Sequence, residues 1–469
     1  MGPETRLGIA RHAAVCALIL SVLAFAGCGG SSHPSTSSSS SSQQQQPGQL
    51  APSTDSSGQV QTFSSSGTVN FGNDFFQNLG TNGRVCFSCH QPSDGWSVTP
   101  SHLQARFNAT GGTDPIFRTN DGTNCPNDDV SSASARQTSY ALLLNKGLIR
   151  IARPIPGNAD FTLTGVVDPY GCASASNLSL YRRPLPTTNL SFETTIMWDA
   201  RENVTQVLFD NLKSQAKNAT LGHAQSAAAP TDAQLAQIVN FETALYTAQS
   251  FDQTAGSLTA QGGLGGTQAL SKQAFSPGVN SFINQSQAFN PVVFTLYQAW
   301  ATSPGSDQFA AGRASVARGE TLFNTRRIDI SQVRGLNDVV NQGIITGSCS
   351  TCHSTPNIGN LSVNNPMNIG TADSFRNTAT LPLPVYTFNC NAGGSFQVTD
   401  PGFALTSGLC ADIGKFKTPA LRGLAARAPY FHNGMSPTLM DVVTFYDQRF
   451  AMNLTDQEKA DLVAFLNSL

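Results

Sequence analysis

The chain has 469 residues, enough for two or three domains with separate hydrophobic cores. Only 12% of the residues are charged and the formal net charge is −2. This composition offers no basic surface for nucleic acid and no acidic run that would steer a cationic partner. We therefore expect association with partners to depend only weakly on salt, and we predict no nucleic-acid binding.

Residues 1–28 are typical of an export signal, with arginines near the start and an apolar core over 13–26 that is too short for a mature transmembrane helix. The segment ends in Leu-Ala-Phe-Ala-Gly-Cys, which resembles a bacterial lipobox except for its Phe. A lipidated Cys28 would anchor a soluble body to a membrane, whereas ordinary cleavage nearby would release it. We expect the periplasm of a Gram-negative bacterium.

Residues 29–66 are rich in Ser, Gln, Gly and Pro, with unbroken runs of Ser over 37–42 and of Gln over 43–46. Such a composition buries too little apolar surface to offset the entropy of ordering the chain. The pattern predicts a disordered tether, with the ordered body beginning near Gly67.

Two copies of one motif carry the chemistry, in a chain with only seven His. A Cys-x-x-Cys-His pentad is the attachment sequence of c-type haem, in which both thiols bond to the haem vinyl groups and the His binds the iron. A zinc or redox site is the alternative, but zinc would need further paired Cys or His nearby. We therefore predict two covalently bound haem c groups. The residues expected to hold them are Cys86, Cys89 and the proximal ligand His90, then Cys349, Cys352 and the proximal ligand His353.

The four remaining cysteines of the body allow three pairings. By proximity we favour Cys125–Cys172 and Cys390–Cys410, one disulfide for each haem-bearing half. Four unpaired buried thiols are the alternative.

Similar capped helices follow the two pentads and indicate an internal repeat. Thr231 and Thr455 each begin a capping box that leads into an amphipathic helix, and residues 314–323 predict the first helix of a second unit. Cytochrome c folds close by crossing an N-terminal and a C-terminal helix. We therefore expect a mainly α fold with two cytochrome c-type domains packed side by side and loop-rich insertions. The predicted limits are 67–250 for the first domain, 251–310 for an interdomain connection and 311–469 for the second domain.

Three further motifs resemble those of bacterial di-haem cytochrome c peroxidases and the related MauG-type enzymes. The resemblance covers roughly residues 70–469. The motifs are Lys-Thr-Pro-Ala-Leu-Arg-Gly at 417–423 followed by Ala-Pro-Tyr-Phe-His-Asn-Gly at 428–434, Trp-Asp-Ala-Arg at 198–201, and the segment 215–225.

For the second haem, the resemblance implies a distal ligand on the helix after the His-Asn-Gly turn. Peroxidases have Met at this position and MauG-type enzymes have Tyr; the gap-free match here is Tyr446, with Met435 as the competing candidate. Thioether ligation raises the iron potential, whereas a phenolate stabilises ferric iron. The third possibility is that Tyr446 is an aromatic residue of the core and binds no iron.

For the first haem, the resemblance implies an open iron, because Asp129 stands where many peroxidases have a distal His. The acid–base Glu of the family is matched by Gln225, whose amide donates a hydrogen bond but cannot shuttle a proton. His223 is close by, and an imidazole can take up and release a proton. It is a candidate acid–base group, a candidate iron ligand or a structural loop residue.

Trp198 matches the family Trp that lies between the haems, so the resemblance implies an electron relay; a buried interface aromatic is the alternative. The resemblance also implies one Ca²⁺ between the domains. Its matched positions are the carbonyls of Arg427 and Pro429 and the side chain of Gln137.

Together these features predict a di-haem c-type peroxidase that reduces hydrogen peroxide at the His90 haem. Electrons would come from a small periplasmic donor, a cytochrome c or a cupredoxin, and pass through Trp198 from the His353 haem. One alternative is a MauG-type oxidase that uses peroxide to oxidise a protein or organic substrate. The other is a non-catalytic electron-transfer cytochrome.

Overall fold

The computed structural model describes residues 47–284 and 288–469, which contain eleven α-helices and eleven strands. The helices are α1 (Pro100–Thr110), α2 (Ala133–Ser139), α3 (Ala141–Lys146), α4 (Leu208–Gly222), α5 (Asp232–Thr243), α6 (Thr267–Ser271), α7 (Gln298–Thr302), α8 (Ala310–Thr325), α9 (Ala404–Ser407), α10 (Leu439–Phe450) and α11 (Asp456–Asn467). The strands are β1 (Ser53–Thr54), β2 (Gly58–Ser64), β3 (Ile149–Arg153), β4 (Phe161–Val167), β5 (Leu178–Arg182), β6 (Leu245–Asp252), β7 (Gly256–Ser257), β8 (Ile328–Ser331), β9 (Ile344–Gly347), β10 (Val385–Cys390) and β11 (Ser395–Val398).

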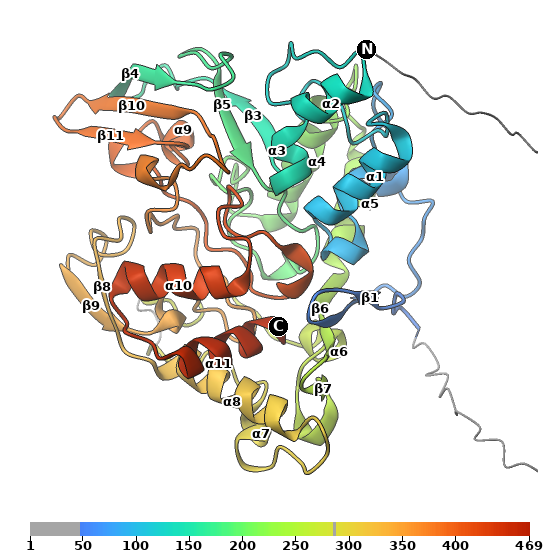
Figure 1. Cartoon of the computed structure of the whole chain (residues 1–469), viewed down its shortest axis with the longest axis vertical. Coiled ribbons are helices and arrows are strands. Elements are labelled where there is room, and N and C mark those ends of the chain that lie inside the picture. The colour runs from blue at the N-terminus through green and yellow to red at the C-terminus, as the bar shows by residue number, and fades with distance from the viewer. Residues whose placement is uncertain (1–46, 285–287) are drawn as a thin grey trace, which may run out of the picture. The chain divides into compact units, whose positions relative to one another are not determined.

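The expected helices around the second pentad are present. Helices α8, α10 and α11 lie together (Figure 1), and α8 crosses α11 so closely that a Cβ on Gly319 would lie 1.9 Å from the carbonyl oxygen of Asp461. Thr231 and Thr455 cap α5 and α11 through the predicted capping boxes. Before the first pentad the chain forms a 3₁₀ turn over Asp74–Phe76.

The strands alter the predicted fold class, and a mainly α fold is not confirmed. Short β-rich stretches, some of them in the predicted tether and some in the haem-bearing halves, pair into antiparallel sheets with the orders β1-β2-β6-β7, β11-β10-β4, β3-β5 and β8-β9. In the second of these, β4 from the first half of the chain pairs with β10 from the second half (Figure 1).

The predicted tether is wrong over its C-terminal part. Strand β2 is paired with β6 along its whole length, with Val60 and Thr62 buried and the Thr62 Oγ1 2.9 Å from the Thr247 Oγ1. Every second residue of this strand is buried, and this burial holds it in the sheet although its composition resembles that of a linker. Residues 1–46, which hold the predicted signal, Cys28 and the rest of the tether, lie outside the described residues.

Residues 45–469 form one compact unit, so the limits of the two predicted domains stay a prediction. The predicted connection 251–310 contributes Phe294, Tyr297 and Trp300 to the same buried core as α8 and α11. The Cys390–Cys410 disulfide is present, whereas Cys125 and Cys172 are not bonded to each other.

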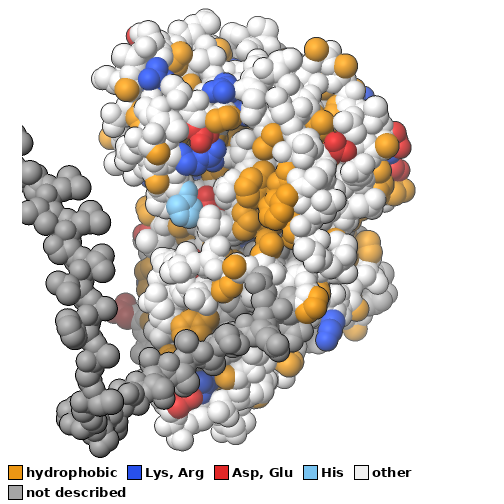
Figure 2. Space-filling model, turned by 90° about the vertical axis from the view of Figure 1, so that its right-hand side faces the viewer, with side chains coloured by type: hydrophobic (Ala, Val, Ile, Leu, Met, Phe, Trp, Pro, Cys, Tyr) orange, Lys and Arg blue, Asp and Glu red, His pale blue; other side chains and the backbone are white. Residues whose placement is uncertain are grey.

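The distribution of charged side chains on the surface agrees with the low content of charged residues in the sequence. On the face in Figure 2, Lys, Arg, Asp and Glu side chains are scattered and neither sign dominates. In the described part of the chain we find no helix with the length and apolarity needed to cross a membrane.

Candidate functional site

Each pentad presents an imidazole in the same way. Cys86 begins a 3₁₀ turn, and the His90 Nδ1 lies 2.9 Å from the Trp96 carbonyl oxygen. Cys349 begins the equivalent turn, and the His353 Nδ1 contacts the Gly359 carbonyl. A backbone carbonyl accepts the Nδ1 proton in both cases and leaves Nε2 as the free ligand atom. Burial lowers the pKa of His90 and of His353 to about 4, which keeps both rings neutral as iron ligation requires.

The residues around each pentad fit a covalently bound c-type haem. The four pentad cysteines are free thiols, and each pair lines a cavity together with its His. The two cavities, with the solvent space at their openings, enclose about 1500 and 1410 Å³ and are lined mainly by apolar side chains. A planar apolar cofactor with two vinyl groups matches such a lining, because burial of its ring supplies hydrophobic free energy and the thiols supply the covalent bonds.

Trp198 lies between the two cavities and lines both of them. Its Nε1–H donates to the Arg183 carbonyl at 2.8 Å. On the second-cavity side its ring centroid lies 6.3 Å from that of His432. His432 is buried, stacks on Phe416 at 3.9 Å, and its Nε2 has no hydrogen-bond partner in the described structure. The indole therefore contacts both cavities, and its role as an electron relay stays a prediction.

One face of α4 and the residue after it cover part of the first cavity. Gln215, Ala219 and His223 are spaced by one helical turn each, and all three line the cavity. Gln225 does not: it follows the end of the helix with a φ of 53°, is exposed, and accepts from the Asn82 side chain at 3.3 Å. The prediction of a cavity-facing amide at Gln225 is therefore corrected, because the helix continues past Ala219 and ends before Gln225.

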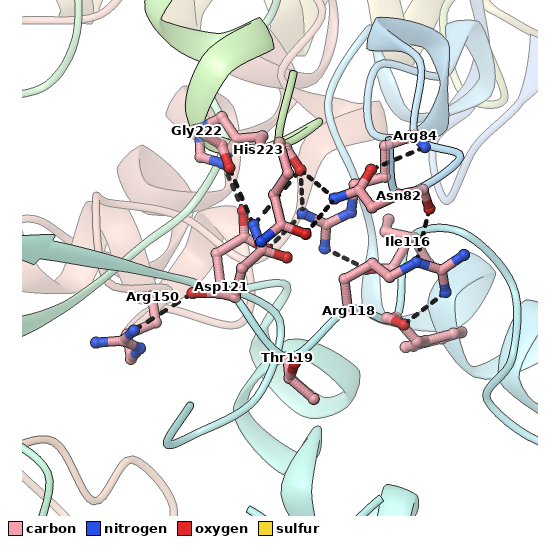
Figure 3. Close-up of polar contacts among 12 residues, drawn as sticks. Asn82, Arg84, Ile116, Arg118, Thr119, Asp121, Arg150, Gly222 and His223 are labelled. Carbon is pink, nitrogen blue, oxygen red and sulfur yellow. Dashed lines mark hydrogen bonds and ion pairs between the residues drawn. The ribbon is translucent and has the colours of Figure 1, made fainter. Parts of the chain in front are cut away.

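His223 is held by a buried carboxylate that the sequence did not reveal. Its Nδ1 lies 2.5 Å from the Asp121 Oδ2, and Arg84 pairs with the other oxygen of Asp121 (Figure 3). The carbonyl oxygen of His223 accepts hydrogen bonds from Asn82 at 2.8 Å and from Arg84 at 3.2 Å. Burial by itself raises the pKa of Asp121, but Arg84 and His223 outweigh it and lower that pKa below its ordinary value. The ionised carboxylate fixes Nδ1 as the protonated nitrogen and leaves Nε2 free to exchange a proton.

The second cavity distinguishes the two candidate distal ligands. Tyr446, on α10, lines this cavity and stands 6.2 Å from the Phe431 ring. Burial raises the pKa of the Tyr446 phenol, and no hydrogen bond to its hydroxyl is formed within the described residues. Met435 does not line the cavity; it packs against the cluster that contains Leu142 and Tyr181. The Met435 alternative is therefore corrected, because the turn after His432 directs it away.

The predicted calcium residues do not fit a divalent cation. Gln137 is exposed on α2, and the Arg427 carbonyl accepts from the Arg183 guanidinium at 3.0 Å. Pro429 follows a cis peptide bond. Within the described ranges no group of three or more His, Cys, Asp or Glu could hold a metal ion.

Two cavity residues, and one residue that contacts the cavity residue His223, escaped the sequence reasoning about catalytic roles. Gln215 lies on the α4 face, and helical spacing back from His223 would have found it. Asp121 comes from a loop distant in sequence, and no local pattern marks it. Glu242 lines the first cavity, and burial raises its pKa to about 8. The sequence showed only an amphipathic helix at that position.

Comparisons with known proteins agree with this site. A family model described as RoxA-like, cytochrome c-like matches residues 415–452. The cytochrome-c peroxidase IdrP2 of Denitromonas iodatirespirans is 38% identical over 133 residues, which are 26% of this chain and 36% of that protein. The cytochrome-c peroxidase IdrP1 of the same organism is 41% identical over 81 residues, or 15% of this chain and 22% of that protein.

A solved structure also resembles the chain. It is the crystal structure of a MauG-like protein associated with microbial copper homeostasis, with a TM-score of 0.38 and 14% identity, covering 85% of this chain and 88% of that one. The chain spans well under half the length of the curated relatives it matches. With two Cys-x-x-Cys-His sites at apolar cavities, the chain is similar over these segments to proteins named cytochrome-c peroxidase, in agreement with the resemblance to di-haem peroxidases and MauG-type enzymes seen in its motifs.

Proposed function

We propose that the protein carries two haem c groups and reduces hydrogen peroxide at the cavity of His90. The observation that supports this most is the His223–Asp121 pair, whose imidazole lines the same cavity as His90. A protein that only stores electrons has no need of a proton-exchanging side chain there. The reaction consumes one peroxide, two electrons and two protons and yields two waters.

The first cavity supplies the groups that handle protons. When bound, haem supplies an iron that takes the oxidising equivalents of peroxide and accepts electrons singly. His223 Nε2 accepts a proton from one peroxide oxygen and returns it to the other, while Asp121 stabilises the transient imidazolium. The Gln215 amide donates a hydrogen bond and orients the substrate. In this role His223 is the catalytic residue and Asp121 positions it.

Trp198 connects this chemistry to the second cavity. It is the indole that lines both cavities, and its Nε1–H is fixed by the Arg183 carbonyl. Electrons from a small cytochrome c or cupredoxin would enter on the His353 side and pass through this ring. The weak surface charge suits a donor that docks with little salt dependence.

A second candidate function is favoured by Tyr446. An oxygen ligand in place of a thioether stabilises oxidised iron and would hold oxidising power long enough for a protein or organic substrate to be oxidised. This is the role of a MauG-type oxidase, with peroxide as the oxidant.

Stopped-flow mixing of the fully haem-loaded protein with peroxide tests the proposal. We expect rapid bleaching of the Soret band and turnover with a reduced cytochrome or cupredoxin. His223→Ala should slow the peroxide reaction by about 10²- to 10⁴-fold. Gln225→Ala is the matched control and should retain the wild-type rate. A long-lived oxidised state without donor turnover would favour the oxidase, and a protein inert to peroxide would be an electron carrier.

Export and anchoring are part of the same proposal. We place the protein in the periplasm, held to a membrane through lipid on Cys28. Mass spectrometry of the mature N-terminus tests this: a diacylated Cys28 is expected, and an unmodified terminus elsewhere would contradict the anchor.

A further inference from the structure

The side chain of Arg183 occupies a closed cage of backbone carbonyls. Its Nη1 donates to the Lys146 carbonyl at 2.7 Å, and its Nη2 donates to the carbonyls of Val98 at 2.7 Å, Arg427 at 3.0 Å and Ala428 at 3.4 Å. The residue is only 5% exposed. In the described part of the chain no carboxylate lies within ion-pair distance of it, so the carbonyl dipoles are its direct partners, while the more distant Asp94 carboxylate also favours the charged guanidinium.

The cage is shaped for a guanidinium. A Cβ on Gly147 would lie 2.3 Å from the Arg183 Nη1, so a side chain there would displace the guanidinium from its present position. Gly147 has a φ of +63°, which glycine adopts without strain. A guanidinium offers five donors spread over a planar fork, whereas an ammonium offers three donors at a single nitrogen, so the guanidinium reaches more of these separated carbonyls.

The cage joins the two halves of the chain at the relay. Val98 and Lys146 belong to the half that carries the first pentad, and Arg427 and Ala428 to the half that carries the second. The main chain of Arg183 adds two further bonds: its N–H donates to the His432 carbonyl at 2.7 Å, and its carbonyl accepts from Trp198 Nε1 at 2.8 Å. One residue therefore contributes to the junction, beside pairs such as Arg182–Asp400, and also holds the indole that lines both cavities.

We propose that the Arg183 guanidinium is a built-in cation that stands in place of calcium at this junction, and that Arg183 is a positioning residue for Trp198. The Arg427 carbonyl, one of the expected calcium ligands, already accepts from the guanidinium. The guanidinium lies 3.0 Å from that oxygen, so a divalent ion bound to the same oxygen would be close to a fixed positive charge, and repulsion would oppose its binding.

The first test is calcium dependence of the haem-loaded protein, measured without peroxide. The electron paramagnetic resonance spectra of both haems and the thermal unfolding midpoint are recorded as purified, after exhaustive EGTA treatment, and after Ca²⁺ is added back. We expect the three states to be identical. A spectrum or midpoint that changes with EGTA and returns with Ca²⁺ would overturn the replacement of calcium, whether or not the protein is a peroxidase.

The second test measures electron transfer between the haems after one of them is reduced. Arg183→Gln should slow this transfer by about tenfold or more, since misplacing a reacting group by about 1 Å can cost up to about 10²-fold. Arg136→Gln is the matched control, because Arg136 also donates to two backbone carbonyls, those of Gly111 and Val130, but within the first half alone. The control should transfer electrons at the wild-type rate.

Arg183→Lys keeps the test decisive if the Gln variant does not fold. It retains the charge but reaches fewer carbonyls, so we expect a slower transfer than in the wild type. A wild-type transfer rate in a folded Arg183→Gln or Arg183→Lys protein would remove Arg183 from any positioning role.

Discussion

The Oδ2 of Asp121 lies 2.5 Å from the Nδ1 of His223, although 102 residues separate the two in the chain. Asp121→Asn removes the negative charge that supports an imidazolium and should lower the rate of the peroxide reaction about 10- to 100-fold. Stopped-flow absorbance of the Soret band measures this. Asp129→Asn, at an exposed aspartate that lines neither cavity, should leave the rate unchanged. An Asp121→Asn rate equal to the wild type would show that His223 acts without its carboxylate.

Trp198→Phe tests the relay. Phenylalanine keeps the ring in the space between the cavities, but it is harder to oxidise and loses the hydrogen bond to Arg183. We expect electron transfer between the haems to slow strongly, while peroxide still reacts in the first cavity. Trp300→Phe is the control, because this buried Trp lines neither cavity. Flash reduction followed by absorbance at the two haems separates these outcomes.

Tyr446→Phe and Met435→Leu decide the distal ligand of the second haem. Tyr446 lines the second cavity and Met435 does not. We expect Tyr446→Phe to change the spin state of that haem in low-temperature electron paramagnetic resonance and to raise its potential, since an anionic oxygen ligand is lost. The spectrum of Met435→Leu should match the wild type. A changed spectrum in Met435→Leu together with a wild-type spectrum in Tyr446→Phe would show that Met435 is the distal ligand.

The burial and ion pairs of Asp199 predict how the free energy of unfolding changes at acid pH. Asp199 is fully buried and pairs with Arg182 at 2.6 Å, Arg201 at 3.0 Å and Arg153 at 3.3 Å. Burial alone raises the pKa of Asp199, but the three guanidiniums lower it far below its ordinary value. A carboxylate with a lowered pKa contributes stability above the ordinary aspartate value, and this contribution is lost as the pH falls towards the folded-state pKa.

Asp199→Asn should therefore destabilise the protein by about 3–5 kcal/mol near neutral pH, because buried charges lose their partner. The difference from the wild type should shrink as the pH falls below about 4, where the unfolded aspartate is protonated. Denaturant unfolding at several pH values measures both. A difference that stays constant with pH would indicate a packing defect rather than a lost ion pair.

We predict a second disulfide, between Cys125 and Cys172. The structure leaves both thiols free but in contact, and burial, followed by the Cys125 contact, raises the pKa of Cys172 to about 12. In an oxidising compartment we expect the pair to join, adding about 2–4 kcal/mol to the free energy of unfolding. Peptide mapping without reductant detects the bond, and Cys125→Ser should abolish it and the added stability. Two alkylatable thiols in the exported protein would contradict the pairing.

Local patterns located the chemistry of this protein because its cofactor is attached covalently at fixed spacing. The two pentads, the capped helices that begin after Thr231 and Thr455, and the Trp-Asp-Ala-Arg segment are all contiguous, so each could be recognised alone. The strand over Gly58–Ser64 was missed because its composition is that of a linker, and only its partner β6 makes it a strand. Gln225 was misplaced because the gap-free alignment did not take into account where α4 ends. The helix ends at Gly222, and Gln225 follows it in an exposed position.

The sequence alone determined that thiols and imidazoles at two pentads are ready for haem, since attachment depends on the order of five adjacent residues. The tertiary structure decided what surrounds those sites: Asp121 behind His223, Arg183 in its carbonyl cage, and Tyr446 rather than Met435 at the second cavity. These contacts join residues tens to hundreds of positions apart. Their energies depend on burial and on distances of a few ångströms, which the order of residues along a chain does not specify.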